Sequence, residues 1–170
     1  MKNYFNLFNL DCDYFINIKE LEKIYQEKIM VNHPDKFVNQ DSEIRQKTLQ
    51  NTSILNSAYE ILKSPEKRAN YILELNGINA FKESDTKMDA EFLLKQIELR
   101  EELEDIDNVD ELYNFLEKIN QEIKDSIAQI SQGFENNDLL KVRNLIRELK
   151  FFKQLQQQTN TLMDKYEEQI

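Results

Sequence analysis

The sequence predicts an all-α protein with two helical parts. Its 170 residues include only two glycines and two prolines, the residue types that interrupt helices, while Leu, Ile, Glu, Lys and Gln are abundant. Apolar residues recur every three or four positions along most of the chain, which is the spacing of one helix face. Hydrophobic residues make up 40% of the chain, enough for a packed core.

Two helices are expected before the first loop. A short amphipathic helix or turn covers residues 4–10. The next helix begins after Asn17, which forms a capping box with Glu20 three residues later, and it ends near Val31.

Two further helices follow this loop. One starts at Asp41 or Ser42, and its apolar face is predicted to contain Ile54, Leu55, Ala58, Tyr59 and Leu62. Ser64 and Pro65 are typical of a helix cap and a first helical residue, and Gly77 ends the helix that they open. The domain boundary is therefore expected after this helix, with residues 1–76 as the first domain, 77–86 as a linker and 87–170 as the second domain.

The second domain is predicted to be an up-down-up bundle of three helices. The first helix covers residues 87–106. Asn108 and Glu111 form a capping box for the second helix, a turn is expected over residues 133–138, and the third helix runs from there to near the C-terminus. The predicted apolar face of the second helix is Leu112, Leu116, Ile119, Ile123, Ile127 and Ile130.

The distribution of charge excludes several functional classes. Residues 1–76 carry 10 Lys and Arg against 11 Asp and Glu, whereas residues 77–170 carry 12 against 21. A generic nucleic-acid binder would have the opposite sign. We expect no membrane span, because no apolar run approaches about 18 residues. We expect no signal peptide, because the N-terminal apolar stretch is short, contains three Asn and is followed by Asp11 and Asp13. The expected location is the bacterial cytoplasm, or a mitochondrial-type matrix for a mature organellar form.

The loop after Val31 contains His33, the only histidine of the chain. A general base needs an orienting partner, and a metal needs further ligands that neither another His nor the single Cys12 supplies. Cys12 is expected to be a small, partly buried apolar side chain. Pro34 fixes its own φ and restricts His33 to extended conformations, so we predict a rigid exposed loop of the kind used in recognition.

These residues carry a resemblance to a known family. His33-Pro34-Asp35, between helices containing "IYQEKIMVN" and "NTSILNSAYEILKSPEKRANYIL", resembles the J-domain, the helical module that recruits Hsp70 chaperones and stimulates their ATPase. "HPDKF", "FLLKQIELREELEDI" at 92–106 and "IRELKFFKQL" at 146–155 resemble the HscB-type co-chaperones of iron–sulfur cluster assembly. The resemblance implies an L-shaped fold: a J-domain built on an antiparallel helix hairpin with the HPD loop, followed by a three-helix bundle.

The resemblance also implies a surface for an HscA-type Hsp70. Its residues would be His33, Pro34, Asp35, Lys36, Lys28 and Lys23. Two departures from the family pattern suggest a weak contact or one tuned to a specialised partner. Glutamates dilute the basic residues of the helix before the loop, and Asn32 stands where an aromatic residue is common.

The first helix of the second domain has two groups of apolar residues. Phe92, Leu99, Leu103 and Ile106 share one face and are the expected core, while Leu93, Leu94 and Ile97 lie about 100–200° away. Phe151 similarly points about 200° from Leu149 on the last helix. Such residues pack under the first domain or a neighbouring chain, or they form an exposed patch that binds a partner. The resemblance favours the patch and implies binding of an IscU-type scaffold by Leu93, Leu94, Ile97, Glu98, Glu101 and Phe151.

The leading hypothesis is a non-enzymatic adaptor that delivers the scaffold to the Hsp70. It needs no metal and no cofactor, is expected to be a monomer, and binds neither nucleic acid nor membrane. One alternative keeps the J-domain and places another client on the bundle. A third hypothesis is a structural helical protein in which the HPD sequence is accidental.

Overall fold

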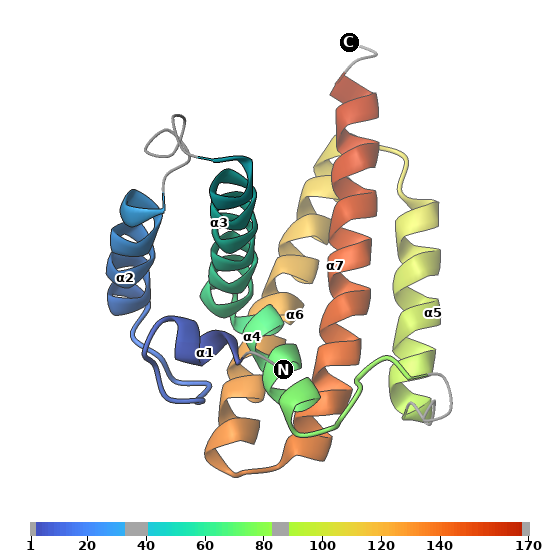
Figure 1. Cartoon of the computed structure of the whole chain (residues 1–170). Coiled ribbons are helices and arrows are strands. Elements are labelled where there is room, and N and C mark those ends of the chain that lie inside the picture. Colours follow the sequence, from blue (N-terminus) through green and yellow to red (C-terminus); the bar gives the residue numbers. More distant parts are fainter. Residues whose placement is uncertain (1–2, 33–40, 83–88, 168–170) are drawn as a thin grey trace. The chain divides into compact units, whose positions relative to one another are not determined.

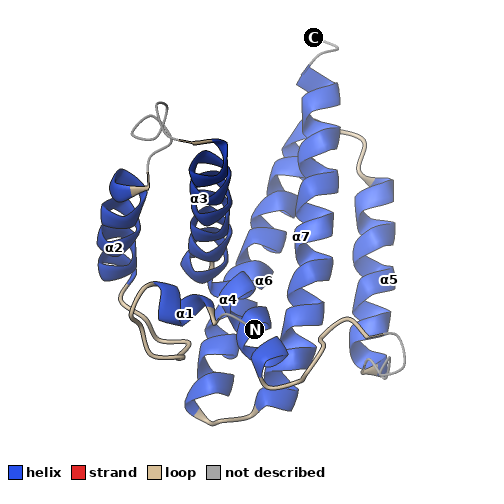
Figure 2. Cartoon of the chain, in the orientation of Figure 1, coloured by secondary structure: helices blue, strands red, loops and turns tan. Residues whose placement is uncertain are grey.

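The computed structural model describes residues 3–32, 41–82 and 89–167, and within them it contains helices and loops but no strand (Figure 2). The helices are α1 (Tyr4–Leu7), α2 (Ile18–Val31), α3 (Ser42–Lys63), α4 (Pro65–Leu75), α5 (Ala90–Asp105), α6 (Val109–Glu135) and α7 (Leu139–Glu167). The all-α prediction is confirmed. The chain forms two compact units, residues 1–72 and 73–170.

The first unit is a helix hairpin closed at its base by α1. Helices α2 and α3 lie side by side, and α1 packs against α3 (Figure 1). Tyr25 of α2 stacks on Tyr59 of α3 with ring centroids 4.0 Å apart, and its hydroxyl donates to Asn56. The fully buried apolar side chains of this unit include Phe5, Phe8, Leu21, Ala58 and Leu62. These residues come from α1, α2, α3 and the segment between α1 and α2, and their shared burial holds the hairpin together.

Helix α4 joins the first helix to the end of α3. Tyr4 and Tyr71 stack with ring centroids 4.7 Å apart, and the Tyr4 N–H donates to the Tyr71 hydroxyl. Arg68 is buried, lies over the ring of Tyr14 and donates to the carbonyl of Leu62. Burial lowers the pKa of Arg68 from its ordinary value. The guanidinium therefore serves as a structural link between three segments.

The predicted helix starts are confirmed at three positions. The Asn17 side chain accepts hydrogen bonds from the N–H groups of Lys19 and Glu20, and Asn108 accepts from Glu111 at 2.9 Å. Pro65 is the first residue of α4. Each polar side chain satisfies N–H groups that the first helical turn leaves unpaired.

Two expectations about individual side chains of the first unit are wrong. Ile54 is 38% exposed, because it sits at the edge of the face of α3 that the other predicted residues bury. Cys12 is exposed and not partly buried, since it lies in the loop before α2 rather than in a helix. No described helix is long and apolar enough to cross a membrane.

The second unit is built on the long pair α6 and α7. These two helices share the most extensive contact in the structure, and α7 also packs against α5 (Figure 1). The α6 side chains buried in this unit are Leu112, Phe115, Ile119, Ile123, Ser126 and Ile130, so Phe115 and Ser126 take the places predicted for Leu116 and Ile127. Helix α7 is thus the centre of the bundle.

The turn between α6 and α7 is shorter than predicted. Helix α6 continues to Glu135, so Gly133 is a helical residue and not the start of a turn. A Cβ on Gly133 would lie 2.6 Å from Cγ2 of Val142, and this close approach is why glycine stands there. Asn137 adopts a positive φ of 55°, and the Asp138 N–H donates to the Gly133 carbonyl at 2.8 Å. Asn137 therefore performs the helix-ending role usually taken by glycine.

Candidate functional site

Helix α5 is the element that carries the candidate partner-binding residues. Asp89 caps it by accepting from the Glu91 N–H. Phe92, Leu99 and Leu103 are buried, as the spacing predicted. The packed side of α5 is therefore narrow, with three buried side chains along the helix, which leaves most of its circumference outside the bundle.

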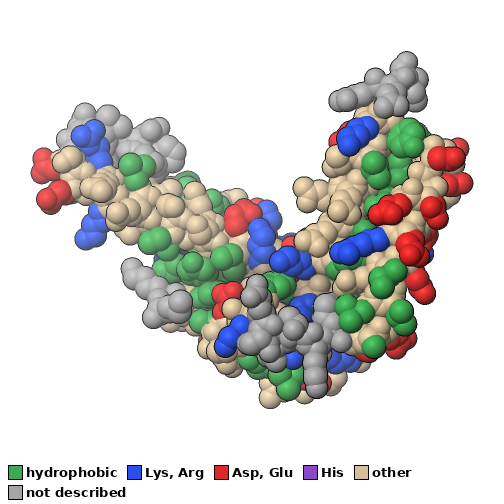
Figure 3. Space-filling model, turned by 90° about the vertical axis from the view of Figure 1, so that its right-hand side faces the viewer, with side chains coloured by type: hydrophobic (Ala, Val, Ile, Leu, Met, Phe, Trp, Pro, Cys, Tyr) green, Lys and Arg blue, Asp and Glu red, His purple; other side chains and the backbone are tan. Residues whose placement is uncertain are grey.

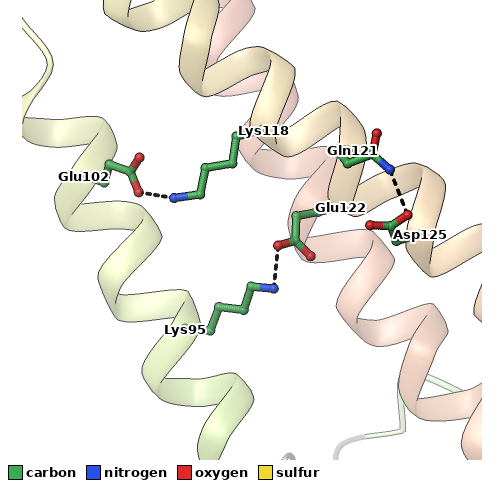
Figure 4. Close-up of polar contacts among 6 residues, drawn as sticks. All are labelled: Lys95, Glu102, Lys118, Gln121, Glu122 and Asp125. Atoms are coloured by element: carbon green, nitrogen blue, oxygen red, sulfur yellow. Dashed lines mark hydrogen bonds and ion pairs between the residues drawn. The ribbon is translucent and has the colours of Figure 1, made fainter.

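Two ion pairs join one edge of α5 to α6. Lys95 Nζ lies 2.6 Å from Glu122 Oε1, and Lys118 Nζ lies 2.6 Å from Glu102 Oε2 (Figure 4). The α5 members of the pairs are seven residues apart and so lie on the same edge of the helix, facing α6. Such exposed pairs add little stability each, so they reinforce an orientation of α5 that the burial of Phe92, Leu99 and Leu103 sets.

The outward side of α5 presents three large apolar side chains. Leu93 is 45% exposed, Leu94 62% and Ile97 53%. We call these three residues the apolar face. Glu98 and Glu101 are also exposed on this helix. Figure 3 shows apolar side chains on the bundle beside a dense group of carboxylates, the composition of an interface with a hydrophobic centre and a charged rim.

Phe151 does not belong to this exposed group. The expectation that it is an exposed residue is wrong, because only 5% of Phe151 is accessible. Its ring meets that of Phe92 edge to face at 5.7 Å, and the guanidinium of Arg100 lies 5.4 Å from its centroid. The physical reason is the central position of α7, which packs against α6 on one side and α5 on the other and therefore buries apolar side chains on both sides.

A half-buried carboxyl group, that of Glu148, lies on α7 near Lys95 of α5 and Glu122 of α6. Burial raises the pKa of Glu148, Lys95 opposes this rise, and Asp89 and Glu122 add to it. Lys95 also lies 5.3 Å from the ring centroid of Phe152. Lys95 of α5 therefore interacts favourably with the negative charge of two carboxylates, Glu122 on α6 and Glu148 on α7.

The residues predicted to contact an Hsp70 are only partly within the described structure. His33, Pro34, Asp35 and Lys36 lie outside the described residues. Lys23 and Lys28 are on α2, the first exposed and the second half-buried.

The end of α2 before this loop is fixed to α3 by a residue that the sequence reasoning missed. The Thr52 hydroxyl donates to the Asn32 carbonyl at 3.2 Å. A threonine three turns along a helix gives no sequence signal for such a contact. The pairs of Lys95 and Lys118 were also missed, although the seven-residue spacing of Lys95 and Glu102 could have indicated one shared edge.

Metal binding finds no support in the described ranges. No group of three His, Cys, Asp or Glu side chains lies close enough to hold an ion there. The arrangement of α5 instead suits contact with a macromolecule.

Comparisons with known proteins cover both units. The family model described as "DnaJ domain" matches residues 3–71, and that described as "HSCB C-terminal oligomerisation domain" matches residues 88–160. The "Co-chaperone protein HscB homolog" of Shewanella denitrificans is 33% identical over 169 residues, covering 95% of this chain and 97% of the relative. That of Shewanella halifaxensis is 34% identical over 169 residues, with the same coverage.

Solved structures agree with these relatives. Chaperone HscB from Vibrio cholerae has a TM-score of 0.81 and 30% identity, covering 96% of this chain and 99% of that one. Human co-chaperone protein HscB has a TM-score of 0.87 over 95% of this chain and 82% of that one, and at 22% identity it supports the fold alone.

Proposed function

The chain belongs to the HscB family of J-domain co-chaperones, and we propose that it delivers an IscU-type iron–sulfur scaffold protein to an HscA-type Hsp70. As a member of this family it is a co-chaperone of iron–sulfur cluster assembly. In the proposed role it performs no chemistry itself, and it acts by binding one protein with each of its two units.

The observation that carries the scaffold half of the proposal is the apolar face of α5. Leu93, Leu94 and Ile97 are each about half exposed on a helix whose opposite side is packed through Phe92, Leu99 and Leu103. Burying such side chains fully is favourable by about 1.5–3 kcal/mol each, and roughly half of that remains available to a partner. Glu98 and Glu101 would attract basic groups of the scaffold and orient it.

The Hsp70 half of the proposal rests on the sequence of the loop and on its family. His33, Pro34 and Asp35 form the HPD sequence within the matched DnaJ domain, with Lys36 following and Lys23 and Lys28 on α2. In the proposed mechanism these residues contact the ATP-bound chaperone and favour the conformation that hydrolyses ATP. The loop would act by differential contact, because nothing in the motif needs to exchange a proton.

The proposed partners imply where and how the protein works. It would act as a monomer in the bacterial cytoplasm, together with the chaperone and the scaffold, and would bind neither nucleic acid nor membrane. The excess of carboxylates in residues 77–170, 21 against 12 basic residues, supports a partner that is not a polyanion. The homologues do not favour the alternative of a different client, and the family match excludes an accidental HPD sequence.

A pair of variants tests the two halves separately. Asp35→Asn should abolish stimulation of the Hsp70 ATPase and leave scaffold affinity unchanged. Leu93→Ala combined with Ile97→Ala should weaken scaffold binding by about 10–100-fold, from lost apolar burial, while stimulation without scaffold stays normal.

Steady-state ATPase assays and calorimetric titration measure these two effects. If Asp35→Asn stimulated the Hsp70 ATPase normally, the assignment of the HPD loop as the Hsp70 contact would be wrong. Unchanged scaffold affinity of the double variant would show that the apolar face is not the scaffold site.

A further inference from the structure

A shallow groove lies next to the apolar face. It has a volume of about 490 Å³ and is formed by residues 80–82, one side of α5 and the middle of α7. Phe151 and Phe81 supply aromatic surface, and Leu93 belongs to both the groove and the apolar face. The two surfaces are therefore continuous.

The charge of this groove is opposite to that of the chain. Lys82, Arg100, Arg147 and Lys150 line it, and none of the described residues that line it is acidic. The whole chain has 32 acidic residues and a formal net charge of −10. Four cations, with no carboxylate among the described lining residues, are unexpected on such a protein, and we call this hollow the basic groove.

Two of the four cations lie over aromatic rings of the groove. Lys150 Nζ lies 4.4 Å from the ring centroid of Phe81, and Arg100 Cζ lies 5.4 Å from that of Phe151. Cations on ring faces lose part of their hydration but keep free N–H donors. Lys150 and Arg100 can therefore donate hydrogen bonds to a carboxylate that enters the groove.

The wall formed by residues 80–82 is fixed to α7. Arg147 Nε donates a hydrogen bond to the carbonyl of Ala80, and the Ala80 side chain is fully buried. Phe81, which follows directly, remains 45% exposed. Because its backbone is anchored, this wall is preorganised, and binding needs little further ordering of the groove.

We propose that the basic groove receives a segment of the scaffold protein in which carboxylates flank an apolar side chain. This inference rests on the proposed function and extends its site beyond α5. The apolar side chain contacts Phe81 and Phe151, and the carboxylates pair with Lys82, Arg100 and Lys150.

The carboxylates of α5 exclude a uniformly charged ligand. Glu98 and Glu101 are exposed on the same helix that contributes Arg100 to the groove. A nucleic acid or an anionic membrane would be repelled by these carboxylates as it approached the groove. A protein surface with both signs of charge can pair with each edge, which fixes the direction in which the scaffold lies across α5.

Neutralising the exposed lysines of the groove tests the proposal. Lys82→Gln combined with Lys150→Gln should weaken binding of the apo scaffold by about five-fold at low salt, with a flatter dependence on salt concentration, because two screened ion pairs are lost. Lys124→Gln combined with Lys165→Gln removes the same charge from exposed positions elsewhere in the unit and should change the affinity less than two-fold. Phe81→Ala should weaken binding without the change in salt dependence.

The outcomes separate this inference from the proposed function. If the Lys82/Lys150 variant kept wild-type affinity and salt dependence, the proposal that the basic groove binds the scaffold would be wrong. The proposed function would still stand if Leu93→Ala with Ile97→Ala weakened scaffold binding. Equal losses in the groove variant and its control would mean a non-specific charge effect and would also overturn the groove. If the wild-type chain bound no scaffold, or bound a DNA oligonucleotide more tightly through these lysines, both assignments would be wrong.

Discussion

Helices α5 and α6 belong to one bundle but use their apolar residues differently. Helix α6 buries a side chain on every turn from Leu112 to Ile130, all apolar except Ser126, and packs against α7. Helix α5 buries three and leaves three others about half exposed. Helix α5 thus has two apolar groups, only one of which packs. The α6–α7 pair supplies most of the buried contact of this unit, and in the proposed function the exposed group of α5 binds the partner.

The largest expected effect separates these two uses of apolar residues. Ile119→Ala removes a fully buried side chain of α6 and should lower the free energy of unfolding by about 2–5 kcal/mol. Leu94→Ala on α5 should change it by less than about 0.5 kcal/mol, because its side chain is 62% exposed. Urea denaturation followed by circular dichroism measures both. A loss above 1 kcal/mol for Leu94→Ala would show that the apolar face is part of the core.

The angular separation of the two groups on α5 was predictable from the sequence. It follows from the 3.6-residue period alone, so Leu99 and Leu103 were correctly placed in the core and Leu94 outside it. The burial of Phe151 was not predictable in this way. A helix period tells which side chains share a face, but burial depends on how many neighbours cover the helix, and α7 has two.

Gly133 illustrates a second limit of the sequence. Glycine next to polar residues is typical of a turn, and this pattern predicts a turn that begins at Gly133. The structure uses Gly133 for a close approach of Val142 inside a continuous helix. Tertiary contact between segments explains the residue, and no local pattern contains that information. Asn137 ended the helix instead, which asparagine can do because it tolerates a positive φ.

The next largest effect tests how tightly the α6–α7 pair is closed. Gly133→Ala should destabilise the protein by about 1–2 kcal/mol, since the new methyl group would meet the buried Cγ2 of Val142 at 2.6 Å. The better helix propensity of alanine offsets part of this cost. A double-mutant cycle with Val142→Ala should show a favourable coupling of about 1 kcal/mol. Additive effects would mean that α6 and α7 separate easily near Gly133. The α6–α7 pair would then be less tightly packed than its comparison with the half-exposed α5 assumes.

The smallest effect concerns Glu148, where the edge of α5 meets the α6–α7 pair. Burial raises the pKa of this carboxyl from its ordinary value of 4.5, against the opposing effect of Lys95. The folded chain therefore holds the proton more tightly than the unfolded chain does. The stabilising contribution of Glu148 is complete below pH 4.5 and is lost as the pH rises through the raised value.

Glu148→Gln should remove this pH dependence. At pH 7–8 the variant should be more stable than the wild type by up to about 0.5 kcal/mol, because no charge is buried, and the difference should vanish or reverse near pH 4. Urea midpoints measured across this range, with Glu135→Gln at an exposed position as the control, test the sign. A variant that is less stable at neutral pH would mean that the attraction of Glu148 to Lys95 outweighs its burial. In that case charge attraction at this corner would help to hold α5 to the bundle, in addition to the burial of Phe92 and the ion pairs of Lys95 and Glu102 with α6.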